Sequence, residues 1–168
     1  AMHGEFGEDG KVQQILQSMN KNFTGPKTLG AALSMHKAKS KEIFKEHGLK
    51  TPHYMIAEKS EDVEKIAFEI FREMQMPVII KPLDKGSSVG ISIARDYESL
   101  VNTLTSLFEY VDRLLIEEYI KGKEASVGVI DKFREQDIYS LLPIEIITPD
   151  GKEFFDYDEF FLLHNCLL

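Results

Sequence analysis

Apolar residues recur at helical spacing in parts of the chain and gather in short runs elsewhere. Residues 63–74 place apolar side chains three or four positions apart, the pattern of an amphipathic helix with one buried stripe. We expect Ser60 to cap this helix, with Glu61 and Asp62 in its first turn, where carboxylates complement the helix dipole. The helix should end before Pro77. Its buried stripe comprises Val63, Ile66, Ala67, Ile70, Phe71 and Met74.

Four further helices follow from the same kind of pattern. One covers residues 12–19, and two cover residues 28–47 and meet near His36. Gly48 suits the position just after the second of these two, where the backbone commonly turns left-handed. The fourth begins after Asp96, a favourable N-cap residue. The residues that this helix turns inward are Leu100, Val101, Leu104, Leu107 and Phe108.

Three lysines recur every fourth residue within the second half of the 28–47 stretch. Lys37, Lys41 and Lys45 therefore line one face of a helix. A charged stripe at this spacing is typical of an exposed helix face. On spacing alone, we interpret these lysines as a solvated surface.

Short runs rich in apolar and β-branched residues predict six strands between and after the helices. They cover residues 53–57, 77–80, 91–94, 113–119, 124–130 and 138–147. In the fifth run, Ala125, Val127 and Val129 alternate with polar residues, which predicts a half-buried strand. A turn should follow at residues 149–151. The order of elements predicts an α/β fold with mixed sheets that include antiparallel hairpins.

Composition and charge narrow the class of protein. The 168 residues are 43% hydrophobic and 29% charged, as in ordinary globular domains, and the formal net charge of −8 argues against a nucleic-acid partner. Since no run approaches the roughly 18 apolar residues that span a bilayer, we expect no membrane partner. Glu5, Glu8 and Asp9 stand where a signal peptide would be apolar. A single cysteine, Cys166, fits a reducing cytoplasm.

A glycine- and serine-rich loop lies between the second and third predicted strands. Gly86 and Gly90 allow the backbone to approach a ligand without a Cβ atom in the way. Ser87 and Ser88 add hydroxyl donors, and Lys81 adds a positive charge at the end of the preceding strand. This combination suits a polyphosphate, held as if by a flap between two strands. The alternative is an ordinary hairpin connection.

A series of short motifs runs along most of the chain: His3-Gly-x-x-Gly-Glu-Asp-Gly10, Gly25, Ala32-Leu-Ser-Met-x-Lys37, Lys41, Lys81-Pro-x-x-x-Gly-Ser-Ser-Val-Gly90, Ile116-Glu117, Gly122-x-Glu124, and Leu142-Pro143 with Glu145. Taken together, these motifs resemble the D-alanine–D-alanine ligase family of the ATP-grasp superfamily. The resemblance extends along the chain to about Tyr157 and keeps the order and spacing of the family's motifs. It implies an ATP-grasp fold, with the central subdomain and the first strands of the C-terminal subdomain.

The resemblance also implies a reaction. The family joins two D-alanines for peptidoglycan synthesis with ATP and Mg²⁺, in the cytoplasm and as a homodimer. The carboxylate of the first D-alanine attacks the γ-phosphate to give an acyl phosphate, and the amine of the second D-alanine then attacks that carbonyl. Such chemistry depends mainly on positioning and on the cancellation of charge.

Family roles carry over to individual residues. The family pattern implies that Lys37 and Lys81 hold the ATP phosphates, and that Ser88 and the Gly86–Gly90 backbone cover the γ-phosphate. Ser87 would order the loop over the substrate, as one of three catalytic-site residues with His3 and Glu8 beside the D-alanines. The implied nucleotide-binding set is Lys37, Lys81, Gly86, Ser87, Ser88, Val89, Gly90, Glu117, Glu118, Tyr119, Ile120 and Glu124.

Within that set, the resemblance assigns the carboxylates to the base and the sugar. Glu117 would accept from the adenine amino group, Glu124 would bind the ribose hydroxyls, and the Glu118–Ile120 backbone would line the adenine slot. The alternative is that these glutamates are ordinary surface carboxylates. The remaining histidines have no metal-ligand spacing, so we expect no zinc site. They are His36, His47, His53 and His164.

The chain departs from the family pattern at both ends. We expect residues 1–27 to be a remnant of the N-terminal domain, 28–117 to be the central subdomain, and 118–168 to be an incomplete C-terminal subdomain. Phe160 and Phe161 replace a lysine and a tyrosine of the family pattern. Residues 162–168 fit no family motif, and the family's Mg²⁺ ligands would lie beyond them.

Two functions of different class therefore remain open. One is an ATP-dependent D-alanine–D-alanine ligase, of which this chain is a partial and inactive portion. The alternative is a non-catalytic nucleotide-binding fragment. A related alternative is an ATP-grasp ligase with another acceptor, such as D-lactate.

Overall fold

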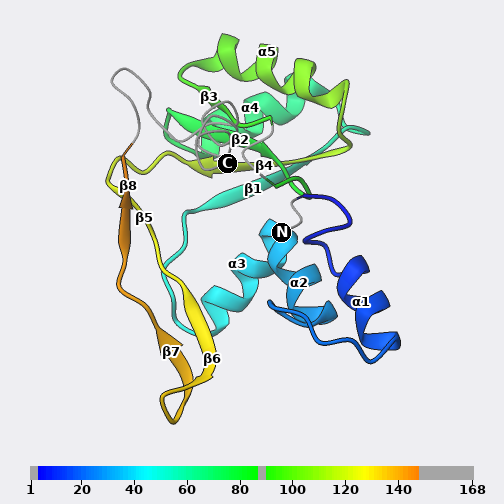
Figure 1. The fold of residues 1–168 in the computed structure, drawn as a ribbon. Coiled ribbons are helices and arrows are strands. Elements are labelled where there is room, and N and C mark those ends of the chain that lie inside the picture. The colour runs from blue at the N-terminus through cyan, green and yellow to red at the C-terminus, as the bar shows by residue number, and fades with distance from the viewer. Residues whose placement is uncertain (1–3, 87–89, 148–168) are drawn as a thin grey trace. The chain divides into compact units, whose positions relative to one another are not determined.

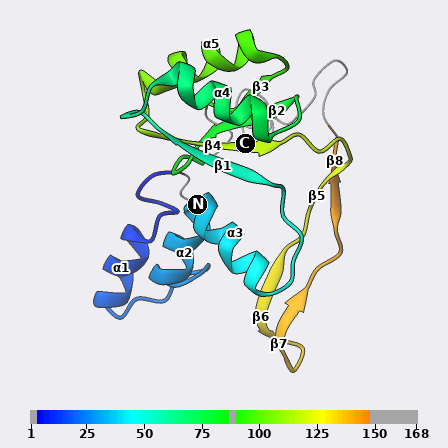
Figure 2. The ribbon, with the colours of Figure 1, turned by 180° about the vertical axis from the view of Figure 1, so that it is seen from behind.

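The computed structural model describes residues 4–86 and 90–147 of the chain. The chain divides into two compact units, Ala1–Tyr119 and Ile120–Leu168. Figures 1 and 2 show both from opposite sides. Among the helices that the structure describes, none has the length and apolar character needed to cross a membrane. The subdomain boundaries expected at residues 27 and 117 stay predictions.

The first unit is built on a four-stranded antiparallel sheet. Its strand order is β1 (Tyr54–Glu58), β4 (Arg113–Glu118), β2 (Val78–Pro82) and β3 (Ser92–Ala94). β4 therefore lies between β1 and β2, although it comes last in sequence. β2 and β3 pair on either side of the glycine-rich loop, which confirms the predicted strand–loop–strand arrangement.

Two helices cover one face of this sheet. Figure 1 shows α4 (Val63–Glu73) and α5 (Tyr97–Phe108) on the same side of the strands. Their apolar stripes pack on alternate residues of the strands, as the two-residue period of a strand requires. The buried residues of this core are Ala57, Ile66, Ala67, Ile70, Met74, Val78, Ile80, Ala94, Leu100, Leu104, Phe108, Leu114 and Ile116. The result is an amphipathic helix pair on a half-buried sheet.

The opposite face of the sheet receives α3 (Lys37–Glu46). Ala38 of this helix packs with Leu83, Leu115 and Tyr54 in a second, smaller core. Figure 1 shows α1 (Lys11–Ser18) and α2 (Thr28–Met35) on the same side as α3. The fold thus places a helix against each face of the strand β4.

The helical boundaries confirm most of the sequence expectations. α2 and α3 meet at His36, whose Nδ1 accepts a hydrogen bond from the Lys39 N–H at 3.3 Å and caps α3. Gly48 has a φ of +71°, the left-handed conformation expected after a helix. Asp96 caps α5 in a reciprocal capping box with Ser99. These local hydrogen bonds lower the pKa of the Asp96 carboxyl.

The start of α4 differs from the prediction. Its N-cap is Asp62, not Ser60, because the Asp62 carboxylate accepts a hydrogen bond from the Lys65 N–H at 3.0 Å. Glu64 then occupies the first turn. The predicted stripe is also wrong at one position, since Phe71 is 48% exposed. It lies edge-on to Tyr97 instead of in the core.

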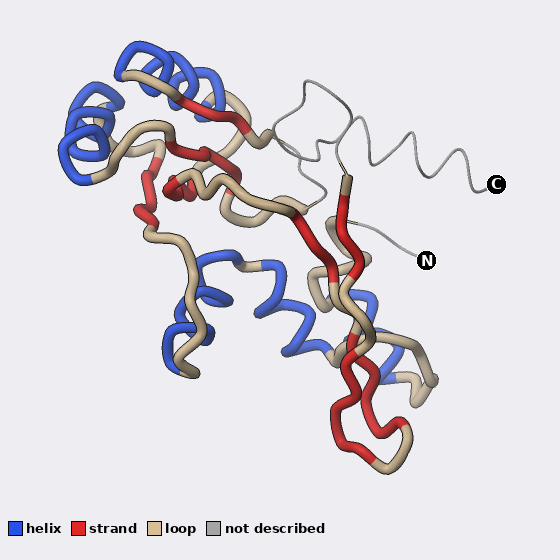
Figure 3. Tube along the Cα trace, turned by 90° about the vertical axis from the view of Figure 1, so that its left-hand side faces the viewer, coloured by secondary structure: helices blue, strands red, loops and turns tan. Residues whose placement is uncertain are grey.

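The described part of the second unit, residues 120–147, has four short strands, and strands are drawn in red in Figure 3. β5 (Glu124–Ser126) pairs with β8 (Ile144–Ile146), and β6 (Val129–Phe133) pairs with β7 (Gln136–Ser140), each antiparallel. Mixed α/β structure with antiparallel sheets is therefore present, as predicted.

The prediction of two long strands in this region is wrong. Residues 124–130 divide between β5 and β6, and residues 138–147 divide between β7 and β8. Pro143 lies in the second break, because a proline has no N–H to donate to a ladder. Val129 is exposed, so the expected half-buried face is also wrong. The turn expected at residues 149–151 lies outside the described residues.

The α4–α5 core gives a direct test of the fold. Leu104 is fully buried, so Leu104→Ala should lower the free energy of unfolding by about 2 to 5 kcal/mol through lost burial and a cavity. Urea unfolding followed by circular dichroism suits a chain without tryptophan. The control is Leu29→Ala, at an exposed leucine, with a change within about 0.5 kcal/mol. Equal effects of the two substitutions would contradict the packing described here.

Candidate functional site: a buried carboxylate between lysines

Both faces of the strand β4 are covered by other parts of the fold, yet this strand carries a glutamate, Glu117, among its buried residues. Residues 114–117 are all buried, and Glu117 is only 5% exposed. Leu115 and Glu117 share the sheet face toward α3, since side chains alternate along a strand. A buried carboxylate is costly unless it is paired and hydrogen-bonded. The partners of Glu117 therefore decide what this face of the sheet can do.

The first partner comes from α3. The Lys41 Nζ lies 2.5 Å from the Glu117 Oε1 and donates to the Thr51 Oγ1 at 2.7 Å and the Pro52 carbonyl at 3.3 Å. Lys41 is itself only 6% exposed. Its ammonium group is thus held by one carboxylate and two neutral oxygens in a place with little water.

The second partner comes from the neighbouring strand. The Lys81 Nζ forms an ion pair with the Glu117 Oε2. In the antiparallel register Ile79 lies opposite Glu117 and Lys81 lies opposite Leu115, so the charged residues are diagonal neighbours on one face. Long side chains can meet across that diagonal. The Lys81 side chain keeps 21% of its surface exposed, more than the Lys41 side chain at 8%.

A third lysine stands close by without pairing directly to the carboxylate. The Lys37 Nζ donates to the backbone carbonyls of Pro82, at 2.9 Å, and Lys85. Burial, and then the positive charge of Lys81, lower the pKa of the Lys37 ammonium. Lys37, Lys41, Lys81 and Glu117 form what we call the Glu117 cluster. Three ammonium groups around one carboxylate leave an excess of positive charge.

The Glu117 cluster opens into a cavity of about 520 Å³ in the first unit. Hydroxyl and apolar side chains from α2 and α3 complete the wall. The lining residues are Gly30, Leu33, Ser34, Lys37, Ser40, Lys41, Ile43, Phe44, Thr51, Lys81 and Glu117. A cavity with excess positive charge and an apolar wall suits a polyanion that also carries a flat apolar group.

The glycine-rich loop begins at the end of the strand that bears Lys81. Gly90 has a φ of +73°, and a Cβ atom there would come within 3.0 Å of the Pro82 ring. Only glycine fits this position without strain. Gly86 is also described, but Ser87, Ser88 and Val89 lie outside the described residues. Their expected roles at a phosphate stay predictions.

The lysine stripe of α3 is not the solvated face that its spacing suggested. Lys41 is buried, and Lys37 is half-buried. Of the three, Lys45 is exposed, with its ammonium 4.7 Å from the centre of the Tyr54 ring. The helix turns this stripe toward the sheet, because Ala38 on the same side packs against Leu115. Lys41 was not among the predicted site residues, although its i+4 spacing from Lys37 is visible in the sequence.

The other predicted site residues lie in several places. Glu8 accepts a hydrogen bond from the Gly4 N–H at 2.6 Å, and His3 lies outside the described residues. Glu118 is exposed and accepts from the His53 N–H at 3.0 Å. The Tyr119 N–H donates to the Pro77 carbonyl at 3.3 Å. For Glu117 the alternative of a surface carboxylate is wrong.

Two predicted residues belong to the second unit. Ile120 and Glu124 are both exposed there. Their expected contacts with the adenine slot and the ribose stay predictions. Among the residues placed by the structure, no group of three His, Cys, Asp or Glu side chains could hold a metal ion.

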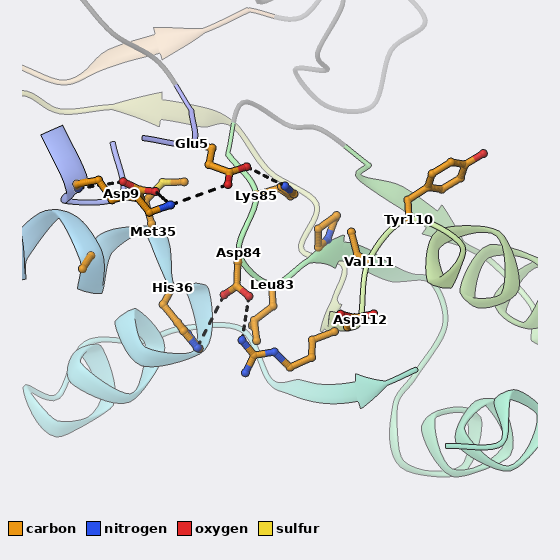
Figure 4. Close-up of a pocket in the computed structure, with 14 residues that line it drawn as sticks. Glu5, Asp9, Met35, His36, Leu83, Asp84, Lys85, Tyr110, Val111 and Asp112 are labelled. Carbon is orange, nitrogen blue, oxygen red and sulfur yellow. Dashed lines mark hydrogen bonds and ion pairs between the residues drawn. The ribbon is translucent and has the colours of Figure 1, made fainter. Parts of the chain in front are cut away.

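A second cavity of about 520 Å³ has a different electrostatic character. Figure 4 shows acidic and basic side chains facing one another along its wall. Asp84 pairs with Arg113 at 2.9 Å and faces His36 at 3.9 Å. Asp9 pairs with Lys11 at 2.9 Å, and this bond lowers the pKa of the Asp9 carboxyl to about 2. Because opposite charges are matched, this cavity suits a polyanion less well than the Glu117 cluster.

The fold and the cluster define a class: a mixed α/β protein with a partly buried lysine cluster suited to a polyphosphate. Residues 43–165 match the family described as D-ala D-ala ligase C-terminus. The chain therefore belongs to the D-alanine–D-alanine ligase family.

Individual relatives agree with this family. The D-alanine–D-alanine ligase of Geobacter sulfurreducens is 36% identical over 157 residues, which are 94% of this chain and 46% of that protein. The enzyme of the same name from Citrifermentans bemidjiense is 40% identical over 158 residues, 94% of this chain and 47% of that protein. The chain thus spans about half the length of the curated relatives it matches.

Solved structures give the same fold. The Bacillus anthracis D-alanine–D-alanine ligase complexed with ATP superposes with a TM-score of 0.73 at 30% identity, over 89% of this chain and 47% of that one. The VanG D-Ala:D-Ser ligase of Enterococcus faecalis gives a TM-score of 0.78 at 29% identity, over 92% and 43%. The predicted ATP-grasp fold is thereby confirmed for part of the ligase structure.

The central ion pairs can be tested by stability. Glu117→Ala should lower the free energy of unfolding by about 3 to 5 kcal/mol, since it leaves the buried Lys41 ammonium without its carboxylate. The matched control is Glu46→Ala, at an exposed glutamate of α3, with a change within about 0.5 kcal/mol. Urea unfolding followed by circular dichroism measures both. A Glu117→Ala variant as stable as the control would contradict the paired, buried carboxylate.

Proposed function

We propose that this chain supplies ATP-binding groups to a D-alanine–D-alanine ligase, which joins two D-alanines for peptidoglycan synthesis. The observation that carries this proposal is the Glu117 cluster, where Lys37, Lys41 and Lys81 give one cavity an excess of positive charge. The family and the ATP complex of a homologue support the same ligand. The cytoplasmic location and the homodimer expected of the family stay predictions.

Each lysine of the proposed site meets a different requirement of a triphosphate. Lys81 is partly exposed at the end of β2, so its ammonium can approach a phosphate while remaining close to the sheet. Lys37 is fixed by backbone carbonyls beside the same strand. Point charges of this kind bind phosphate without demanding one geometry. Glu117 would accept from the adenine amino group, and the apolar wall with Phe44 would receive the base.

The proposed reaction requires these residues to position the substrates and to compensate negative charge. Attack of a D-alanine carboxylate on the γ-phosphate brings two anions together, and the ammonium groups of Lys37 and Lys81 lower that repulsion. The same charges stabilise the ADP that leaves. The amine of the second D-alanine then attacks the acyl carbon, and the C–O bond to phosphate breaks, so that inorganic phosphate leaves and the nitrogen loses a proton. His3, Glu8 and Ser87 keep their proposed places beside the amino acids.

Magnesium would supply further charge compensation between the phosphates when bound. The described residues do not fit this ion, since it requires several hard oxygen ligands. The one carboxylate of the cluster is already engaged by two ammonium groups. No step is therefore assigned to a metal held by this part of the chain.

A second acceptor is a specific alternative. The superposition on the VanG D-Ala:D-Ser ligase is at least as close as that on the Bacillus anthracis enzyme. We therefore keep D-serine, and the D-lactate expected from the sequence, as candidate acceptors. A non-catalytic nucleotide-binding role also stays open, because the chain spans about half of its relatives.

One assay separates these functions. The purified 168-residue chain is incubated with ATP, Mg²⁺ and D-alanine, and both ADP and dipeptide are measured; parallel samples contain D-serine or D-lactate. Calorimetry measures ATP binding on the same preparation. Binding without turnover supports a nucleotide-binding part of a ligase, and turnover with one acceptor identifies the reaction. The absence of ATP binding would contradict the proposal.

Lys81 gives the sharpest mutational test. Lys81→Ala should abolish measurable ATP binding, because it removes a partly exposed ammonium that lines the cavity and leaves the cluster less positive. Lys45→Ala is the matched control, since this lysine is exposed on α3, and it should change the affinity by less than about twofold. Calorimetry measures both variants. Unchanged ATP affinity in Lys81→Ala would rule out the assigned role.

The lowered pKa of Lys37 predicts a pH dependence. ATP should bind more weakly as the pH rises through this pKa, below the ordinary value of 10.5, because the amine loses the charge that attracts phosphate. The free energy of unfolding should rise over the same interval, since the unfolded chain binds the extra proton. Lys37→Arg keeps its charge and should remove this fall in affinity. Calorimetric titrations from neutral pH up to the ordinary value of 10.5 measure it.

The matched control for this pH profile is Lys39→Arg. Lys39 is exposed and hydrogen-bonds to Glu42, which raises its pKa. Its replacement should leave the wild-type profile unchanged. The same fall in affinity in Lys37→Arg and the wild type would assign the titration to another group.

A further inference from the structure

The Glu117 carboxylate and the proposed phosphate ligand compete for the same ammonium group. Lys81 pairs with the Glu117 Oε2 in the structure, yet a bound triphosphate would attract the same Nζ. If Lys81 moves toward phosphate, one side of a carboxylate that is 5% exposed loses its partner. An uncompensated buried charge is strongly unfavourable. Ligand binding therefore requires a second group that keeps Glu117 paired.

Lys41 meets that requirement. Its ammonium holds the other carboxylate oxygen, Oε1, at 2.5 Å, so it stays in contact when Oε2 is released. The Thr51 hydroxyl and the Pro52 carbonyl use its remaining donors and fix its position. An ammonium group has three donors, and all three have partners here. Lys41 thus has little freedom to leave Glu117 for a ligand.

Lys81 and Lys41 differ in exposure and position, as expected if one binds phosphate and the other stays paired with Glu117. The Lys81 side chain is more exposed than that of Lys41 and stands at the start of the glycine-rich loop. Lys41 lies deeper, between α3 and the segment before β1, with its ammonium also 5.3 Å from the centre of the Tyr54 ring. Lys81 is placed to exchange its carboxylate partner for phosphate, and Lys41 is placed to keep its contact with Glu117.

We infer that Lys41 is a positioning residue that keeps Glu117 paired and in place, and so frees Lys81 to bind phosphate. This inference rests on the proposed ATP site, and it adds a residue that the sequence analysis did not assign. Lys41 acts through Glu117 and not by touching the ligand. Without Lys41, Glu117 would retain Lys81 and compete with the incoming phosphate.

Inorganic tripolyphosphate is the appropriate probe, because it has no base and reports on the ammonium groups alone. Calorimetry on the 168-residue chain compares the wild type, Lys41→Met, Glu117→Gln and the double variant. Lys41→Met should weaken binding about tenfold, within the range of coupled neighbours. Glu117→Gln should strengthen it, since the competing charge is gone. In the Glu117→Gln background, Lys41→Met should change the affinity by less than about threefold.

This coupling distinguishes positioning from simple attraction. If Lys41 contacts phosphate itself, its removal weakens binding equally in both backgrounds, which would overturn the inference. Lys45→Met removes an exposed charge from the same helix and should have less than about a twofold effect. Lys41→Arg, which keeps the charge, should restore most of the affinity. An unchanged affinity in Lys41→Met would also overturn the inference.

The outcomes also separate this inference from the proposed function. A wild-type chain that binds neither ATP nor tripolyphosphate contradicts the proposed site, and with it the role of Lys41. A wild-type chain that binds both, with no coupling between Lys41 and Glu117, contradicts the role of Lys41 alone. Should Lys41→Met not fold, Lys41→Gln replaces it, since an amide can still hydrogen-bond to Thr51. Tripolyphosphate binding by Lys41→Gln in the wild-type and Glu117→Gln backgrounds then tests the role of Lys41.

Discussion

The rest of the site depends on the ion-paired carboxylate of Glu117, which is buried on a strand with both faces covered. Glu117 can occupy this place because ammonium groups reach it from two directions, one from α3 and one from β2. Pairing of this kind holds a helix, two strands and the segment at Thr51 in a common arrangement. Stability and ligand binding therefore draw on the same charges, which couples folding of the first unit to the state of its cavity.

The division of labour between the two faces of the sheet follows from the strand period. Alternate residues of β2 and β4 pack under α4 and α5 in a dry apolar core, while the residues between them face α3. The core supplies rigidity, since its leucines and isoleucines are all buried. The other face supplies charge. A rigid sheet thus holds the lysines at fixed spacing without polar groups in its main core.

The sequence predicted much of this fold, because local signals determine helices. The α2–α3 junction at His36 and the cap at Asp96 follow from neighbouring residues. The predicted start of α4 was wrong because Ser60 and Asp62 are both favourable N-cap residues. Burial of Lys41 could not be predicted from spacing, since solvated and buried stripes have the same period. The contact between Lys81 and Glu117 depends on the register of strands that lie far apart in sequence.

The antiparallel register has a consequence for how this protein can vary. A one-residue insertion or deletion within β2 would turn Lys81 under α4 and α5 and present Ile80 or Pro82 to Glu117. The ammonium would then enter an apolar core and the carboxylate would lose a partner, so one small change would damage both layers together. Length changes should therefore be tolerated in the connections around this sheet and excluded from β2 and β4, whatever side chains are substituted elsewhere.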